Sequence, residues 1–126
     1  MRLRNVPGAR EVMIENEYVF TEPEGMKGTW SQVFGNDNPI RIEIGMGKGT
    51  FITTLAANNP DINYVGIEKY SSVLLRAVEK QDELQLPNLR FIRMDAEAIC
   101  EVFGEGEVDR ICLLYTSPSP RDTERS

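Results

Sequence analysis

Short β-branched segments and segments of helical periodicity alternate from residue 40 onward, and no other feature constrains the fold as strongly. Strands are predicted for four apolar runs, residues 40–44, 63–68, 89–94 and 108–114. Helices are predicted between them, over residues 48–58, over a longer segment from Ser71 or Ser72 to the break at Pro87, and over residues 96–103. Strands joined in this way form right-handed β-α-β units. The chain is therefore predicted to have an α/β fold, with a parallel sheet and helices on both faces.

The apolar residues of the two longer predicted helices indicate which faces they bury. In the first helix, the helical spacing selects Phe51, Ile52, Leu55 and Ala56. In the second, Ser71 or Ser72 is the expected N-cap, and the expected buried stripe consists of Val73, Leu74, Ala77, Val78 and Leu84.

Three segments of different character divide the chain. Residues 1–39 are less regular, and we expect an arm and lid in which residues 18–20 form a short strand and Trp30, Val33 and Phe34 pack as a helix or lid. Residues 40–115 are expected to form the α/β core. Residues 116–126 contain no large apolar side chain, so they are expected to be disordered. The sheet would then stop after its fourth strand with an open edge, so we expect an incomplete domain and a tail that is not native.

Histidine is absent from the chain, and its absence excludes several kinds of site. Without imidazole there is no Ser-His-Asp or Cys-His catalysis, and Cys100 and Cys112 alone are too few ligands for zinc. We therefore expect no metal site and two unpaired thiols.

The charge is unevenly distributed along the chain. A net charge of −6 argues against a simple nucleic-acid-binding domain, but the first ten residues contain Arg2, Arg4 and Arg10 and no acid. This basic arm is either a phosphate contact or an ordinary solvated terminus. No apolar run reaches the ~20 residues of a membrane span, and no apolar segment follows the N-terminal charges as in a signal peptide, so a cytoplasmic protein is expected.

A glycine-rich turn links the first predicted core strand to its helix, in the sequence Ile42-Glu-Ile-Gly-Met-Gly-Lys-Gly-Thr50. Glycines allow the backbone to turn tightly and to approach a ligand, and the helix N-terminus supplies free N–H groups. In open parallel sheets, ligands bind beyond the carboxyl ends of the strands, where the strand order reverses. We place that reversal at the first core strand and therefore expect the binding site there.

Three classes of ligand use such a turn. A P-loop requires a glycine at position 42, which is isoleucine, and a hydroxyl residue at position 49, which is glycine, so it is excluded. A dinucleotide site fits Gly45 and Gly47 but not Thr50, and Glu68 has the spacing of a ribose-binding acid. A nicotinamide-dependent oxidoreductase therefore stays as an alternative.

The third class is S-adenosylmethionine, whose reactive end carries a sulfonium and an ammonium group. An acid beside the turn favours such a cation and would repel a pyrophosphate, and Glu43 is that acid. Glu68 can accept hydrogen bonds from both ribose hydroxyls, and Asp95 from the adenine amino group. Because these acids end or nearly end three successive strands, we predict a site for S-adenosylmethionine formed by Glu43, Gly45, Gly47, Glu68 and Asp95.

Five segments resemble one family in particular, the bacterial tRNA (guanine-N7-)-methyltransferases, which are class I methyltransferases with a Rossmann-like fold. The segments are Met1-Arg-Leu-Arg-Asn-Val-Pro7, Gly28-Thr-Trp-Ser-Gln-Val-Phe-Gly-Asn-Asp-Asn-Pro39, Ile42-Glu-Ile-Gly-Met-Gly-Lys-Gly49, Asn59-Pro-Asp-Ile-Asn-Tyr-Val-Gly-Ile-Glu68 and Asp95-Ala-Glu97. The similarity extends over about residues 1–111.

The resemblance implies methyl transfer from S-adenosylmethionine to N7 of a guanine in the variable loop of tRNA. It also implies that Glu43, Glu68 and Asp95 contact the methyl donor, and it favours Arg2, Arg4 and Arg10 as contacts to tRNA. The family has an aspartate and a tryptophan where this chain has Ser117 and Ser119. The alternative is therefore a catalytically inactive remnant that at most binds S-adenosylmethionine or tRNA.

Overall fold

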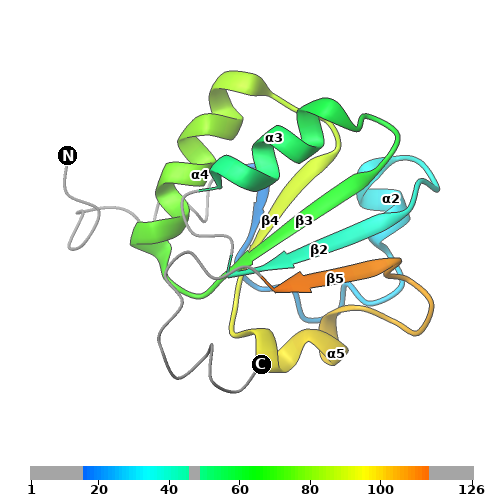
Figure 1. The fold of residues 1–126 in the computed structure, drawn as a ribbon. Coiled ribbons are helices and arrows are strands. Elements are labelled where there is room, and N and C mark those ends of the chain that lie inside the picture. The colour runs from blue at the N-terminus through cyan, green and yellow to red at the C-terminus, as the bar shows by residue number, and fades with distance from the viewer. Residues whose placement is uncertain (1–15, 46–48, 114–126) are drawn as a thin grey trace, which may run out of the picture.

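A parallel sheet forms the middle layer of the computed structural model, which describes residues 16–45 and 49–113 (Figure 1). Within these residues the sheet has five strands in the order β1-β4-β3-β2-β5. The strands are β1 (Val19–Phe20), β2 (Ile40–Ile44), β3 (Asn63–Glu68), β4 (Leu89–Arg93) and β5 (Arg110–Leu113). All of the neighbouring pairs are parallel, as the sequence predicts.

The strand order reverses at β2. In the register, Ile42 lies between Val65 of β3 and Ile111 of β5. From β2 the chain first moves outward to β3 and β4, and it then returns to place β5 on the other side of β2. This is a topological switch point, and it lies at the strand where the sequence predicts it.

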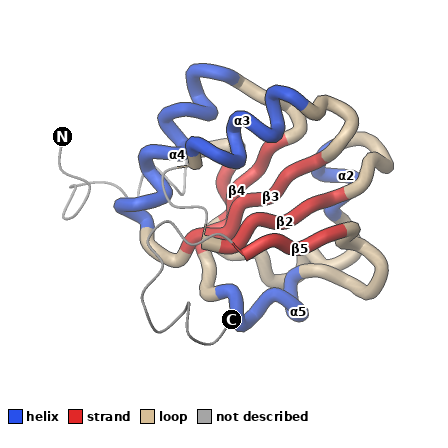
Figure 2. The backbone as a smooth tube through the Cα atoms, viewed as in Figure 1, coloured by secondary structure: helices blue, strands red, loops and turns tan. Residues whose placement is uncertain are grey.

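Helices cover both faces of the sheet, which confirms the predicted layer arrangement (Figure 2). On one face lie α3 (Thr50–Asn58) and α4 (Ser71–Leu84). On the other lie α2 (Trp30–Phe34) and α5 (Ile99–Val102), which follows the 3-10 turn η1 (Ala96–Ala98). Among the described residues no helix has the length and apolar composition needed to cross a bilayer.

Each face of the sheet has its own apolar core because side chains alternate along a strand. The core between the sheet and α3 and α4 contains Val19, Ile52, Ala56, Tyr64, Leu74, Leu75, Ala77, Val78, Leu89 and Phe91. The core on the opposite face contains Trp30, Ile40, Ile42, Val65, Ile67, Ile92, Val102 and Phe103. The predicted strand at residues 18–20 is the short β1, which pairs with β4, so residues 18–34 contribute to the same sheet and the same cores.

Two expected core residues are exposed instead. Phe51 and Leu84 have 53% and 50% of their surface accessible. The last core-facing position of α4 is taken by Gln81, whose amide donates to the carbonyl oxygens of Leu86 and Leu89 and accepts from Leu86 N. Leu84 follows it at the end of the helix and lies outside the buried stripe.

The start of α4 also differs from the prediction. The N-cap is Tyr70, and its side chain makes no capping hydrogen bond. The carboxylate of Glu68 accepts from Lys69 N and Tyr70 N instead, at 3.1 and 3.4 Å. The predicted capping by Ser71 or Ser72 is therefore wrong, and the acid at the end of β3 accepts from the backbone just before the first turn of the helix.

Gln85 is the one described residue other than glycine with a positive φ, of 53°, and it ends α4. Because glycine adopts this conformation without a Cβ clash, we expect Gln85→Gly to raise the free energy of unfolding by about 0.5–1 kcal/mol. Gln32→Gly, at an exposed right-handed position in α2, is the matched control and should lower it by about 0.5–1 kcal/mol. Denaturant unfolding measures both, and a loss of stability in Gln85→Gly would contradict the expectation.

Candidate functional site

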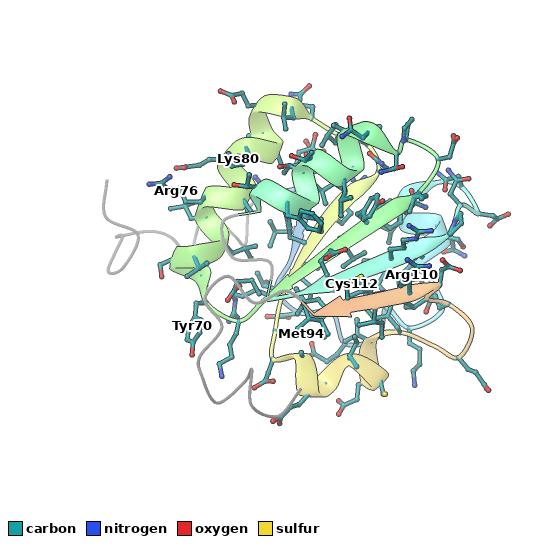
Figure 3. The ribbon with its side chains drawn as sticks, in the orientation of Figure 1. Tyr70, Arg76, Lys80, Met94, Arg110 and Cys112 are labelled. Atoms are coloured by element: carbon teal, nitrogen blue, oxygen red, sulfur yellow. The ribbon has the colours of Figure 1, made fainter. Side chains whose placement is uncertain are left out.

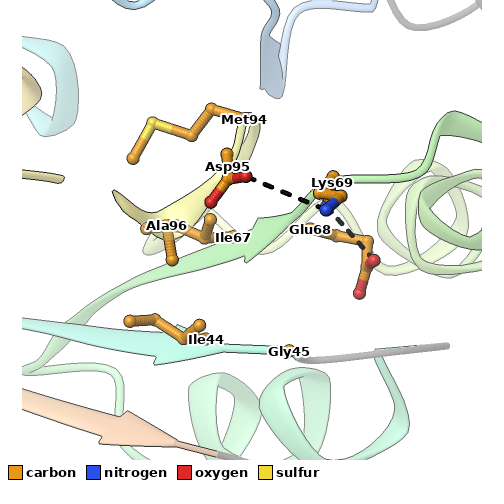
Figure 4. Close-up of a pocket in the computed structure, with 8 residues that line it drawn as sticks. All are labelled: Ile44, Gly45, Ile67, Glu68, Lys69, Met94, Asp95 and Ala96. Carbon is orange, nitrogen blue, oxygen red and sulfur yellow. Dashed lines mark hydrogen bonds and ion pairs between the residues drawn. The ribbon is translucent and has the colours of Figure 1, made fainter. Parts of the chain in front are cut away.

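A pocket of about 200 Å³ opens at the carboxyl ends of β2, β3 and β4 (Figure 4). The register places Ile44 beside Ile67 and Glu68 beside Arg93, so the three strands end at the same edge of the sheet. The pocket combines apolar side chains with two acids and one base. The described residues that line it are Ile44, Gly45, Ile67, Glu68, Lys69, Met94, Asp95 and Ala96.

Asp95 follows β4 and is held in place by the backbone of the next turn. Its Oδ1 accepts from Glu97 N at 3.0 Å, which makes it the N-cap of η1. Its Oδ2 lies 3.8 Å from Lys69 Nζ. Asp95 is exposed, so a ligand in the pocket can reach its carboxylate.

Glu68 ends β3 on the same rim and is partly buried. The hydrogen bonds from Lys69 N and Tyr70 N hold its carboxylate at the start of α4. The structure therefore brings together Glu68, Asp95 and Gly45 of the predicted site. Gly45 has a φ of 74°, a conformation that favours glycine, and it lies at the end of β2.

Glu43 lies apart from this pocket. Ile42 and Ile44 on either side of it pack in the core with α2 and α5, so Glu43 points to the opposite face, toward α3 and α4. Its register partner on β5 is Cys112, and the two side chains are hydrogen-bonded. Of the three acids predicted to share one site, Glu68 and Asp95 line this pocket. Glu43 does not, because side chains alternate along β2 and its side chain lies on the other face of the sheet.

The carboxylate of Glu43 is buried, with 2% of the residue exposed. No residue of the described chain donates a hydrogen bond to its Oε1. Burial raises the pKa of Glu43 above the ordinary carboxyl value, and the hydrogen bond from Cys112 acts in the opposite direction with a smaller effect. A buried carboxylate oxygen without a donor is costly, and such groups occur where a ligand supplies the partner.

Several predicted site residues lie outside the described part of the chain. These are Gly47 in the turn, Arg2, Arg4 and Arg10 in the arm, and Ser117 in the tail. The sequence did not single out Lys69 or the apolar pocket residues Ile44, Ile67, Met94 and Ala96, and Lys69 is the charged one among them. The sequence could have indicated Lys69 by its position directly after Glu68, at the end of the same strand. Among residues 16–45 and 49–113, no group of three or more acids and cysteines is arranged to hold a metal ion.

A family model described as "Putative methyltransferase" matches residues 37–125, which include the sheet from β2 to β5 and the whole pocket. The chain belongs to this methyltransferase family. Among curated relatives, the tRNA (guanine-N(7)-)-methyltransferase of Lachnoclostridium phytofermentans is 62% identical over 122 residues, which are 97% of this chain and 57% of the relative. The enzyme of the same description from Geobacillus sp. (strain WCH70) is 51% identical, over 96% of this chain and 56% of the relative. The chain thus spans less than two thirds of the length of these relatives.

Solved structures support the fold. The one described as "Structure of an Antibiotic Related Methyltransferase" has a TM-score of 0.60 and 23% identity, and covers 76% of this chain and 53% of its own. A "putative methyltransferase from streptococcus mutans in complex with SAH" has a TM-score of 0.52 and 19% identity, and covers 69% of this chain and 52% of its own. The predicted Rossmann-like class I methyltransferase fold is confirmed.

Proposed function

We propose that the pocket is part of a site for S-adenosylmethionine, and that the complete protein transfers its methyl group to N7 of a variable-loop guanine in tRNA. The observation that carries the first part is the position of Glu68 and Asp95 on the rim of a largely apolar pocket at the switch point. The second part is supported by family membership and by the similarity to tRNA (guanine-N(7)-)-methyltransferases.

The pocket residues have the chemistry that an adenosyl group requires. Ile44, Ile67 and Met94 offer apolar surface for a flat adenine ring. Asp95 would accept a hydrogen bond from the adenine amino group, and Glu68 would accept from the ribose hydroxyls. Both acids are already oriented by backbone N–H groups, so little side-chain conformational entropy is lost when a ligand binds.

Glu43 fits the charged end of the same ligand. Glu43 is two residues before Gly45 in the chain, close to the glycine-rich segment that precedes α3, and none of the described residues donates to its Oε1. A ligand ammonium or sulfonium group near this carboxylate would be attracted by a charge that burial leaves poorly screened. We propose that Glu43 acts from the α3 face of the sheet, with Gly45 and Gly47 giving the ligand access across the turn.

The proposed reaction places few demands on the side chains. S-adenosylmethionine supplies a methyl group activated by its sulfonium. Guanine N7 carries a lone pair, so no general base has to remove a proton first, and a chain without histidine can support the reaction. The residues of the chain contribute by holding the donor in line with the base and by electrostatics.

The substrate side is proposed to include the basic arm. Arg2, Arg4 and Arg10 would contact tRNA phosphates, whose charge they complement. In this arrangement the residues before β1 serve as the arm, and residues 40–115 together with β1 and α2 form the donor-binding core. Residues 116–126 would be a tail without a role. A tRNA substrate would place the protein in the cytoplasm.

Calorimetric titration with S-adenosylmethionine, S-adenosylhomocysteine and NAD tests the proposal. We expect the two adenosyl ligands to bind and NAD not to bind, and each ligand at about a hundredfold its Kd should stabilise the fold by about 2.7 kcal/mol. Binding of NAD alone would favour an oxidoreductase and contradict the proposal.

Methyl transfer is measured separately, with labelled donor and unmodified tRNA. Transfer to guanine N7 supports the whole proposal. Donor binding without transfer supports the second candidate, a remnant that keeps the donor site, which the replacement of the family aspartate by Ser117 favours.

A further inference from the structure

Lys69 is the one cation among the described residues that line the pocket. It lies between Glu68 and Asp95 at the rim, and it follows β3 directly (Figure 4). Its ammonium is 5.5 Å from the centroid of the Tyr70 ring and 3.8 Å from Asp95 Oδ2. The ring and the carboxylate both attract this charge.

The two oxygens of Asp95 are in different states. Oδ1 accepts from Glu97 N at 3.0 Å and is committed to the backbone of η1. Oδ2 faces Lys69 Nζ at 3.8 Å, beyond the ~2.7–3.2 Å of a hydrogen bond, so the two form an ion pair without one. Oδ2 is therefore the oxygen that a ligand would use, and it is also the oxygen that Lys69 partly neutralises.

We propose that Lys69 is an affinity-determining residue that competes with the bound nucleoside for Asp95 Oδ2. The inference rests on the proposed function, in which Asp95 accepts from the adenine amino group. A nearby ammonium reduces the negative charge that strengthens such a hydrogen bond. Lys69 thereby weakens the binding of any adenosyl ligand, including the demethylated product that has to leave before the next turnover.

Lys69→Met tests the proposal because it removes the charge and keeps an unbranched apolar stem. The probe is S-adenosylhomocysteine, which carries no net charge, and its Kd is measured by calorimetry at low and high salt. Since exposed ion pairs contribute about 0.2–1 kcal/mol, we expect binding about 1.4- to fivefold tighter in Lys69→Met at low salt. The difference should shrink at high salt, where the pair is screened.

Lys80→Met is the matched control, since Lys80 is on α4 and does not line the pocket (Figure 3). It should leave the affinity unchanged. Asp95→Asn supplies a second control, because its side-chain oxygen can still accept from Glu97 N while the charge that pairs with Lys69 is gone. In the Asp95→Asn background, Lys69→Met should produce no further gain.

The outcomes separate this inference from the function on which it rests. Unchanged or weaker binding in Lys69→Met, with binding to the unsubstituted chain intact, would overturn the inference alone. If Lys69→Met still tightens binding in the Asp95→Asn background, the inference is also overturned. The effect would then come from the Lys69 charge itself and not from its pairing with Asp95. If the unsubstituted chain does not bind S-adenosylhomocysteine, the proposed function itself is contradicted.

Discussion

Replacing Trp30 with alanine is expected to lower the free energy of unfolding by about 3–5 kcal/mol. Trp30 is fully buried between the sheet and α5. Its ring stacks on Phe103 at 4.9 Å between centroids and meets Phe20 edge-on at 5.4 Å. Its indole N–H also donates to the carbonyl oxygen of Val102 at 2.9 Å. The alanine variant would leave a cavity and a buried acceptor without its donor.

The backbone around Trp30 depends on Glu107, which lies far away in the sequence. The Oε2 of Glu107 accepts from Trp30 N at 3.0 Å. Its Oε1 accepts from Gly28 N at 2.8 Å and from Gly104 N at 2.7 Å. One carboxylate thus joins the start of α2 to the turn before β5. A five-residue helix has little stability of its own, so these contacts keep α2 in place.

Far-UV circular dichroism during denaturant unfolding is the suitable measurement, because Trp30 is the only tryptophan and its fluorescence disappears with it. Trp30→Phe keeps an aromatic ring and loses the N–H donor. Its free energy of unfolding should lie between those of the alanine variant and the unsubstituted chain. The control is Phe51→Ala at an exposed position, with an expected change within about 0.5 kcal/mol. A loss below about 1 kcal/mol in Trp30→Ala would contradict this account of the core.

Replacing Glu43 with glutamine is expected to weaken S-adenosylmethionine binding by about 1.5–3 kcal/mol, or roughly 10- to 100-fold in Kd. In the proposed site its buried carboxylate faces the cationic end of the donor, and the amide keeps the shape but loses the charge. Glu68→Gln should weaken binding to a similar extent through the ribose hydroxyls. Calorimetry measures both, with exposed Glu83→Gln on α4 as the control. Unchanged affinity in both site variants would contradict the assignment of these acids.

The same Glu43→Gln substitution should stabilise the ligand-free protein at neutral pH, by an amount on the order of 1 kcal/mol. Burial raises the pKa of Glu43 in the folded state, so between the ordinary carboxyl pKa and the raised value the folded protein binds more protons than the unfolded chain. The Glu43 contribution to stability therefore falls as the pH rises through that window, and the loss is complete above it. Unfolding measured over a pH series should show this fall in the unsubstituted chain and a smaller one in Glu43→Gln.

The Glu43 carboxylate would then lower the free energy of unfolding of the ligand-free protein while strengthening the binding of the donor. A substitution that raises stability and lowers affinity at the same time is typical of a residue in a functional site. If Glu43→Gln instead destabilises the ligand-free protein, the hydrogen bond with Cys112 is the larger effect and Glu43 is primarily structural.

The sequence alone determined the succession of strands and helices along the chain, the parallel direction of the strands, the helices on both faces and the position of the switch point at β2. Each of these depends on local periodicity, on β-α-β handedness or on a turn signal, which neighbouring residues carry. The sequence also predicted that Glu68 and Asp95 lie at one edge of the sheet, because the carboxyl ends of parallel strands meet there.

The tertiary structure alone decided what depends on residues far apart in the chain. Glu107 and Trp30 are 77 positions apart, so no local pattern predicts their hydrogen bond. The exposure of Leu84 depends on how the side chain of Gln81 meets the turn into β4. The direction of Glu43 follows from which face of β2 packs on α2 and α5, and the pairing of Lys69 with Asp95 follows from β3 and β4 ending side by side. Local sequence specifies elements and their order, whereas the charges that meet at a site are set by the packing of the whole sheet.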